Sequence, residues 1–210
     1  MNSIHPTVFI IDDDSSIRRS LSLYLMSYDY TVETYSSSEE YLERVPFQGP
    51  GCIILDVNLK GRTGIELQEE LLKQNSHLPI IFITGFGDIR MSVETIKKGA
   101  VNFLEKPFKE EELLKSVSEA VDLCRKIIEE KDEAILAGRL VGSLTPRETE
   151  ILKYLITGML NKQIASELSI AEHTVKLHRH SICDKLGVKS VPEIIRIADR
   201  AGVVPIKNNY

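Results

Sequence analysis

Short apolar runs alternate with longer stretches of helical periodicity along the first half of the chain. Five of these runs are rich in β-branched residues and cover positions 7–12, 31–35, 52–56, 80–84 and 101–104. The first, third and fourth are apolar throughout, as in central strands covered on both faces, whereas residues 31–35 alternate like an edge strand. The spacing predicts β-α-β units, and therefore an α/β fold with a doubly wound, five-stranded parallel sheet.

A further helix is predicted to begin after Pro107 and to run beyond the sheet domain. Residues 110–112 are all glutamate and supply an acidic first turn, which stabilises a helix N-terminus. Residues 125–137 contain neither Pro nor Gly, which indicates a helical linker that ends near Gly138. We therefore expect a first domain at 1–122, a helical linker at 123–140 and a second domain at 141–210.

The pattern becomes entirely helical from Leu144 onward. Thr145 and Glu148 fit a capping box, and Pro146 suits the first turn of a helix. That helix should end near Thr157, and three more are predicted at 161–168, 172–186 and 191–201. The second and third are joined by a tight turn, and the third is rich in basic residues. We therefore predict an all-α domain of four helices that contains a helix-turn-helix.

Composition narrows the class of protein. With 42% hydrophobic and 27% charged residues, the chain suits a soluble globular protein. No long apolar stretch or leader pattern occurs, which favours a cytoplasmic protein that makes no membrane contact. Residues 1–122 hold 12 Lys and Arg against 20 Asp and Glu, whereas residues 141–210 hold 10 against 7. This asymmetry indicates a nucleic-acid partner for the second domain alone.

Acidic residues follow two of the predicted strands. Asp12, Asp13 and Asp14 come after the first strand, and Asp56 ends the third. In an open parallel sheet these two strand ends meet where the strand order reverses, so the carboxylates should converge there. Clustered carboxylates repel one another unless a cation neutralises them, and oxygen ligands favour Mg²⁺. For Asp14 alone, capping of the following helix is an equally good interpretation.

Two further polar residues belong to the same edge of the predicted sheet. Thr84 ends the fourth strand, and Lys106 lies just past the fifth. A metal ion, a nucleophilic carboxylate, a hydroxyl and an ammonium group together supply what phosphoryl transfer requires. The pattern therefore indicates phosphoryl transfer at this edge.

Particular segments of the chain resemble a known family. The segments VFIIDDD, CIILDVNLKGRTG, IIFITGFGD and GAVNFLEKPF resemble the flavodoxin-like receiver domain of NarL/FixJ response regulators. Residues 144–188 resemble the LuxR-type DNA-binding domain of the same family. The resemblance covers nearly the whole chain, and it implies a two-component response regulator.

The resemblance assigns roles at the acidic edge. It implies that Asp56 accepts a phosphoryl group from a sensor histidine kinase. Asp13, Asp56 and the backbone carbonyl of Asn58 are expected to ligate Mg²⁺, with Asp12 acting through water. Thr84 is expected to hold the phosphoryl oxygens.

The resemblance also implies roles for Lys106 and for the conformational change that follows phosphorylation. Lys106 is expected to hold the phosphoryl oxygens together with the hydroxyl group of Thr84. The peptide bond between Lys106 and Pro107 should be cis. Phe103 is expected to reorient on phosphorylation and so to promote a homodimer. Lys60 replaces the proline usual in this family, with Arg62 in the same loop, and neither is expected to touch the chemistry.

The third helix of the second domain is expected to read promoter DNA. Val175, Ile182 and Leu186 should face the core and leave the basic side of the helix outward. By resemblance, bases in double-stranded DNA are read by Lys176, Leu177 and His180. The same resemblance places five residues nearer the DNA backbone, namely Asn161, Lys162, Thr174, His178 and Lys185. The helical spacing leaves Arg179 available outward as a further DNA contact. The last helix is apolar enough to support dimerisation, and RNA polymerase is a candidate partner.

Two alternatives share part of this pattern. A Mg²⁺-dependent phosphatase of small molecules could use the same carboxylates, but the chain has no apparent cap domain, and Asn58 stands where an aspartate is expected. A transcription factor that needs no phosphorylation typically lacks one of the pocket residues, and all are present here. We therefore predict a transcriptional regulator rather than an enzyme, whose receiver catalyses only its own phosphotransfer and dephosphorylation.

Overall fold

A computed structural model describes residues 5–85 and 95–206 of the chain. The chain divides into two compact units, one that extends to Ile128 and one that begins at Glu129. Within the described ranges, no helix combines the length and the apolar character that crossing a membrane requires.

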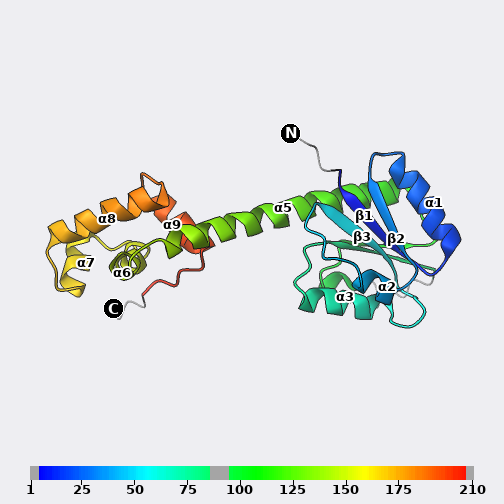
Figure 1. Cartoon of the computed structure of the whole chain (residues 1–210), viewed down its shortest axis with the longest axis horizontal. Helices are drawn as coiled ribbons and strands as arrows, with labels where there is room; N and C mark the ends of the chain where they lie inside the picture. The colour runs from blue at the N-terminus through cyan, green and yellow to red at the C-terminus, as the bar shows by residue number, and fades with distance from the viewer. Residues whose placement is uncertain (1–4, 86–94, 207–210) are drawn as a thin grey trace. The chain divides into compact units, whose positions relative to one another are not determined.

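The first unit is built on a parallel sheet of five strands, as predicted (Figure 1). The strand order is β2-β1-β3-β4-β5, which places residues 31–35 at one edge as their alternating pattern indicated. The fifth strand lies one residue later than predicted. The strands are β1 (Thr7–Ile11), β2 (Thr31–Tyr35), β3 (Gly51–Asp56), β4 (Ile80–Thr84) and β5 (Asn102–Glu105).

Helices cover both faces of this sheet (Figure 1). On one face α1 (Ser15–Met26) and α5 (Glu110–Gly142) pack on a buried apolar layer that includes Ile10 and Ile54. On the other face α2 (Ser38–Leu42) and α3 (Gly64–Lys73) pack on a layer that includes Phe9 and Phe82. Because both faces are buried, the central strands are apolar throughout. Of the helix expected between β4 and β5, the described residues include only the end, at 95–97.

The α5 helix continues through the predicted linker without a break. It ends at Gly142, so the expected end near Gly138 is wrong. Ala137 is buried in the second unit, and Leu140 and Val141 pack against that unit's core. This packing outweighs the cost of a glycine inside a helix, which is about 1 kcal/mol.

The second unit is a four-helix domain, as predicted. Its helices are α6 (Pro146–Leu155), α7 (Asn161–Glu167), α8 (Glu172–Leu186) and α9 (Val191–Arg200). Thr145 caps α6 and forms the predicted capping box with Glu148. Gly187 ends α8 in the left-handed region, with a φ of 67°. The core of the unit contains Ile151, Leu155, Ile164, Val175, Ile182 and Ile194.

Close packing of α3 against the end of β3 requires a glycine at the start of the helix. A Cβ atom at Gly64 would collide with the backbone carbonyl of Asp56. Gly64 also donates its N–H to the carbonyl of Val57, which holds the two segments together. The glycine thus lets the helix begin directly against the strand that carries Asp56.

We expect Gly64→Ala to destabilise the first unit by about 1–3 kcal/mol, because backbone rather than a flexible side chain must move. Chemical denaturation followed by circular dichroism measures the loss. Gly85→Ala is the matched control, since a Cβ there meets nothing within 4 Å. Equal stability of the two variants would contradict the packing argument.

Candidate functional site

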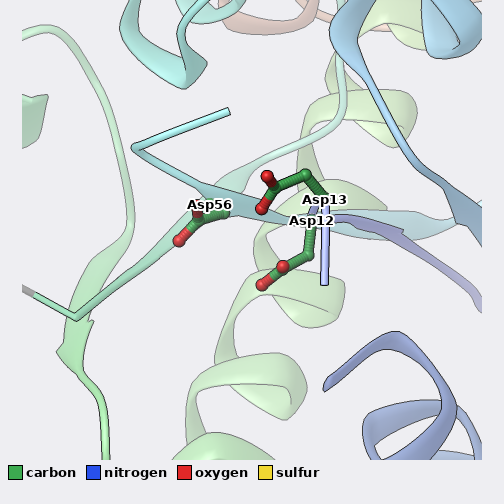
Figure 2. Close-up of side chains that lie close together, drawn as sticks. All are labelled: Asp12, Asp13 and Asp56. Atoms are coloured by element: carbon green, nitrogen blue, oxygen red, sulfur yellow. The ribbon is translucent and has the colours of Figure 1, made fainter. Parts of the chain in front are cut away.

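Three carboxylates meet at the carboxyl ends of β1 and β3. The two strands pair in parallel with Ile11 opposite Leu55, so the next residues, Asp12 and Asp56, lie side by side. Asp12 and Asp56 are buried, and Asp13 is half-buried. One oxygen from each carboxylate can be chosen so that all three lie within 4.8 Å of one another (Figure 2).

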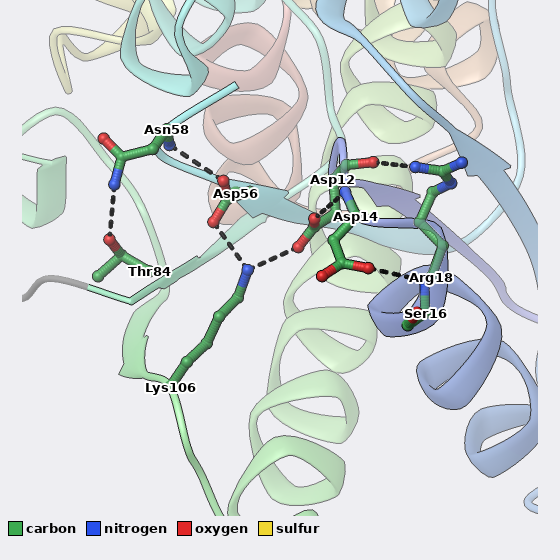
Figure 3. A network of polar contacts seen from close by, with 8 residues as sticks. All are labelled: Asp12, Asp14, Ser16, Arg18, Asp56, Asn58, Thr84 and Lys106. Atoms are coloured by element: carbon green, nitrogen blue, oxygen red, sulfur yellow. Dashed lines mark hydrogen bonds and ion pairs between the residues drawn. The ribbon is translucent and has the colours of Figure 1, made fainter. Parts of the chain in front are cut away.

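Lys106 joins two of these carboxylates from the end of β5 (Figure 3). Its Nζ donates to Asp12 Oδ2 at 2.6 Å and to Asp56 Oδ1 at 2.9 Å. Its backbone N–H donates to the carbonyl of Thr84, which fixes the start of the lysine side chain. The peptide bond between Lys106 and Pro107 is cis, as the resemblance implies.

The electrostatics of this ion pair reflect its burial. Burial raises the pKa of Asp56 above its ordinary value, although the hydrogen bond and charge of Lys106 oppose the rise. Burial lowers the pKa of Lys106, but its bonds to Asp12 and Asp56 outweigh that effect, and the pKa is raised overall. The lysine therefore stays charged and keeps positive charge among the carboxylates.

Asn58 and Thr84 lie on the other side of Asp56 (Figure 3). The backbone N–H of Asn58 donates to Asp56 Oδ2 at 3.2 Å, and its side-chain amide donates to Thr84 Oγ1 at 3.3 Å. Thr84 is fully buried. Phe103 is half-buried against the core, with its ring centroid 6.5 Å from that of Phe82. Its predicted role as a switch stays a prediction.

Asp14 is a helix cap in this structure. Its carboxylate accepts a hydrogen bond from the backbone N–H of Ser16 at 2.8 Å, and it is absent from the carboxylate cluster found among the described residues. That bond lowers the pKa of Asp14 below its ordinary value. Arg18, which the sequence did not single out, donates to the backbone carbonyl of Asp12 from the next turn (Figure 3).

Lys60 contacts the cluster, and the expectation that it lies clear of the chemistry is therefore wrong. Its Nζ is 3.1 Å from Asp13 Oδ2. Arg62 is turned instead toward α2, since its backbone carbonyl accepts from Ser38 and its N–H donates to Glu39. The replacement of the usual proline by a lysine was the available signal, because a long cation so close to Asp56 in sequence can reach the acidic edge.

The donor set of this cluster fits Mg²⁺. Asp12, Asp13 and Asp56 offer only oxygen atoms, which are the ligands that hard divalent cations prefer. Oxygens that share one Mg²⁺ lie at most about 4.2 Å apart, given bonds of about 2.1 Å, and the three carboxylates are already close to that spacing. The spacing of the three carboxylates is therefore compatible with one shared Mg²⁺.

The α8 helix presents its polar side outward. Val175, Ile182 and Leu186 are buried as predicted. Lys176, Leu177 and His180 are exposed, and 56% of the Leu177 surface is accessible.

The other residues predicted to contact DNA differ in their surroundings. Arg179 is half-buried and donates to Asn161 Oδ1 at 3.4 Å, which links α8 to α7. Lys162 is exposed, whereas Thr174 and His178 are half-buried. Lys162 is therefore the most exposed of these five residues, and their DNA contacts stay predictions.

Lys185 has a protein partner of its own. Its Nζ donates to Glu148 Oε2 at 2.6 Å, and Ser181 donates to Oε1 of the same carboxylate. Glu148 is only 4% exposed and also accepts from Thr145. These bonds, with Lys185 first, lower the pKa of Glu148 to about 2. The network ties the start of α6 to α8, and the predicted DNA contact of Lys185 stays a prediction.

The five-stranded parallel sheet with its acidic edge and the four-helix unit are the two parts of a receiver joined to a helix-turn-helix domain. Residues 8–118 match the model of the response regulator receiver domain, and residues 142–198 match that of the bacterial regulatory proteins of the luxR family. The chain therefore belongs to the response regulators of this architecture, a family of transcriptional regulators rather than of enzymes.

Individual relatives agree over the full architecture. The chain is 41% identical to nodulation protein W of Bradyrhizobium diazoefficiens over 93% of this chain and 86% of that protein. It is 36% identical to the transcriptional regulatory protein FixJ of the same organism, over 94% and 96%. Among solved structures, the response regulator StyR matches with a TM-score of 0.79 and 42% identity, over 93% and 99%. The resemblance to the NarL/FixJ family is thereby confirmed.

We expect Glu148→Gln to destabilise the second unit by about 1–3 kcal/mol, because Lys185 loses its charged partner. The stabilisation by Glu148 is present above its ordinary pKa of 4.5 and is lost as the pH falls toward 2. Thermal unfolding between about pH 6 and pH 2 should therefore show a weaker acid dependence in the variant. Glu150→Gln removes an exposed partner of Arg147 from the same helix and is the matched control. Identical pH profiles for Glu148→Gln and the unmodified protein would contradict the assignment.

Proposed function

We propose that the protein is a two-component response regulator that is phosphorylated on Asp56 by a sensor histidine kinase and controls transcription through its second unit. One observation carries the proposal: a buried carboxylate is held by Lys106 beside two further carboxylates. A receiver needs a nucleophile, a site for a divalent cation and a fixed cation at one place. The positions of Asp56, the acidic cluster and Lys106 meet these needs.

The proposed reaction transfers a phosphoryl group between two nucleophiles. A carboxylate oxygen of Asp56 attacks the phosphorus in line, the new O–P bond forms, and the N–P bond of the donor phosphohistidine breaks. The electron pair of that bond returns to the imidazole nitrogen. Bound Mg²⁺ would neutralise charge on the transferring oxygens. Its proposed ligands are Asp13, Asp56 and the Asn58 carbonyl, with Asp12 acting through water.

The other residues of the site hold the product. The Lys106 ammonium already contacts Asp56 and is placed to bind an oxygen of the phosphoryl group. Thr84 accepts a hydrogen bond from Asn58, and we propose that its side chain turns on phosphorylation so that the hydroxyl donates to the phosphoryl group. We propose that Phe103 reorients together with Thr84 and that this change favours a homodimer.

The second unit supplies the output. The exposed polar face of α8 fits the major groove, with Lys176, Leu177 and His180 proposed as the residues that read bases. Lys162 is proposed to contact a phosphate from α7. A dimer would bind both half-sites of an inverted repeat at once and would therefore have a higher affinity for it.

Two other functions fit the observations less well. A small-molecule phosphatase must enclose its substrate, yet residues 8–118 are accounted for by a receiver domain. A regulator that needs no phosphorylation has no use for a buried Asp56 bound to a lysine, because burying these charges has a cost in stability.

We expect the protein to gain the mass of one phosphate when it is incubated with acetyl phosphate and Mg²⁺. The expectation follows from the ionised carboxylate of Asp56 and its neighbouring cations, and intact-protein mass spectrometry measures it. Asp56→Asn, which has the same shape but a much weaker nucleophile, should gain nothing. An unmodified native protein would favour the phosphorylation-independent alternative, and turnover of small phosphate esters would favour the phosphatase.

The DNA assignments predict different effects for two lysines. Lys176→Ala should weaken binding by about 1–3 kcal/mol on the cognate sequence and relax its sequence preference, because a base contact is lost. Lys162→Ala should weaken binding to cognate and random DNA alike, because a phosphate contact is lost. Fluorescence anisotropy with both kinds of DNA measures the difference. Equal effects of Lys176→Ala on the two DNAs would refute its role as a base reader.

A further inference from the structure

The loop between β3 and α3 holds Lys60 in a defined place. Gly61 makes the turn, with a φ of 83°, and Arg62 is hydrogen-bonded to α2 through both of its backbone groups. Thr63 then caps α3 and forms a capping box with Glu66. The backbone on the C-terminal side of Lys60 is therefore fixed, and the freedom that remains belongs to the exposed lysine side chain.

This side chain completes a set of ion pairs around the acidic cluster. Lys106 pairs with Asp12 and Asp56, and Lys60 pairs with Asp13 at 3.1 Å. Each of the three carboxylates therefore has an ammonium partner. The pair of Asp13 differs from the others because Lys60 is 88% exposed, whereas Lys106 is 19% exposed.

A divalent cation and the Lys60 ammonium cannot occupy the same side of Asp13 without cost. A metal ion bonded to an Asp13 oxygen lies about 2.1 Å from it, which is closer than the ammonium now is. A metal ion and an ammonium group bound to the same carboxylate lie close enough to repel each other. The metal must therefore displace Lys60 or bind beside it. Displacement is possible because an exposed ammonium group can return to water, and exposed ion pairs contribute little to stability.

We propose that Lys60 is a built-in counter-ion of Asp13 that competes with the divalent cation and so weakens metal binding to this receiver. The inference rests on the proposed function, because it assumes that the cluster binds Mg²⁺. Lys60 would then set the concentration of Mg²⁺ that the phosphorylation of Asp56 requires. Lys60 acts on Asp13 and has no contact with Asp56 among the ion pairs of the described residues.

Metal binding to the full chain tests this proposal directly. Mn²⁺ is the probe, since the electron paramagnetic resonance signal of the free ion decreases as the protein binds it, and Mg²⁺ is then added as a competitor. Lys60→Gln removes the charge and keeps a polar side chain that is one atom shorter, whereas Lys60→Arg keeps the charge. Arg62→Gln is the matched control, because it removes one positive charge from the same loop at a side chain that has no ion pair with the cluster in the described residues.

We expect Lys60→Gln to bind both ions about two- to fivefold more tightly, the range that an exposed ion pair supports. Lys60→Arg should resemble the unmodified protein, and Arg62→Gln should change the affinity by less than twofold. The difference between Lys60→Gln and the unmodified protein should shrink at high salt, which screens exposed charges.

Other results overturn the inference in distinguishable ways. If Asp13→Asn loses affinity but Lys60→Gln does not gain it, the competition is wrong and the metal site stands. If Arg62→Gln gains as much as Lys60→Gln, the effect is one of net charge, and the pairing with Asp13 is irrelevant. If Asp13→Asn binds Mn²⁺ as the unmodified protein does, the proposed metal site fails and the role of Lys60 fails with it.

Discussion

Repulsion between carboxylates at one edge of the sheet is the constraint on which the site depends. Asp12 and Asp56 are almost fully buried and adjacent, so both can remain ionised only when positive charge lies between them. Lys106 supplies that charge because its ammonium group contacts both carboxylates, and Lys60 supplies a second charge at the surface. A phosphoryl group adds negative charge to this balance, and for that reason its arrival can rearrange the neighbouring side chains.

The fold provides the scaffold for this balance. The strand order brings the ends of β1 and β3 together, and the fixed ends of β4 and β5 place Thr84 and Lys106 beside them. In the second unit a single carboxylate has a comparable structural role, because Glu148 connects the cap of α6 with α8. Each unit thus has its own core and its own buried charged centre, and α5 contributes residues to both cores.

Much of the fold could be predicted because burial leaves a regular pattern in the sequence. The apolar runs predicted the bounds of the strands to within a few residues, and the capping signal at Thr145 predicted the start of α6. The short helix α2 was not predicted, since it has five residues and buries only Ser38 and Tyr41. The continuation of α5 through Gly138 was missed because tertiary packing, which no local pattern records, overrides a weak propensity.

The site was predictable in part for the same reason. Strand ends are set by topology, so the meeting of Asp12 and Asp56 followed from the strand order. The partners of Lys60, Arg18 and Lys185 depend on how far a flexible side chain reaches across a loop or between helices. Such contacts have no sequence period, and only the coordinates show them.

The central claim is that the charge at Asp56 controls the DNA-binding unit, and one measurement tests it most directly. The affinity of the full chain for its promoter DNA is measured with and without beryllofluoride, which mimics a phosphoryl group on an aspartate. The account predicts at least about tenfold tighter binding for the unmodified protein and no change for Asp56→Asn, since tenfold corresponds to about 1.4 kcal/mol, within the usual range of coupling between sites. Equal affinities with and without the mimic would contradict the account.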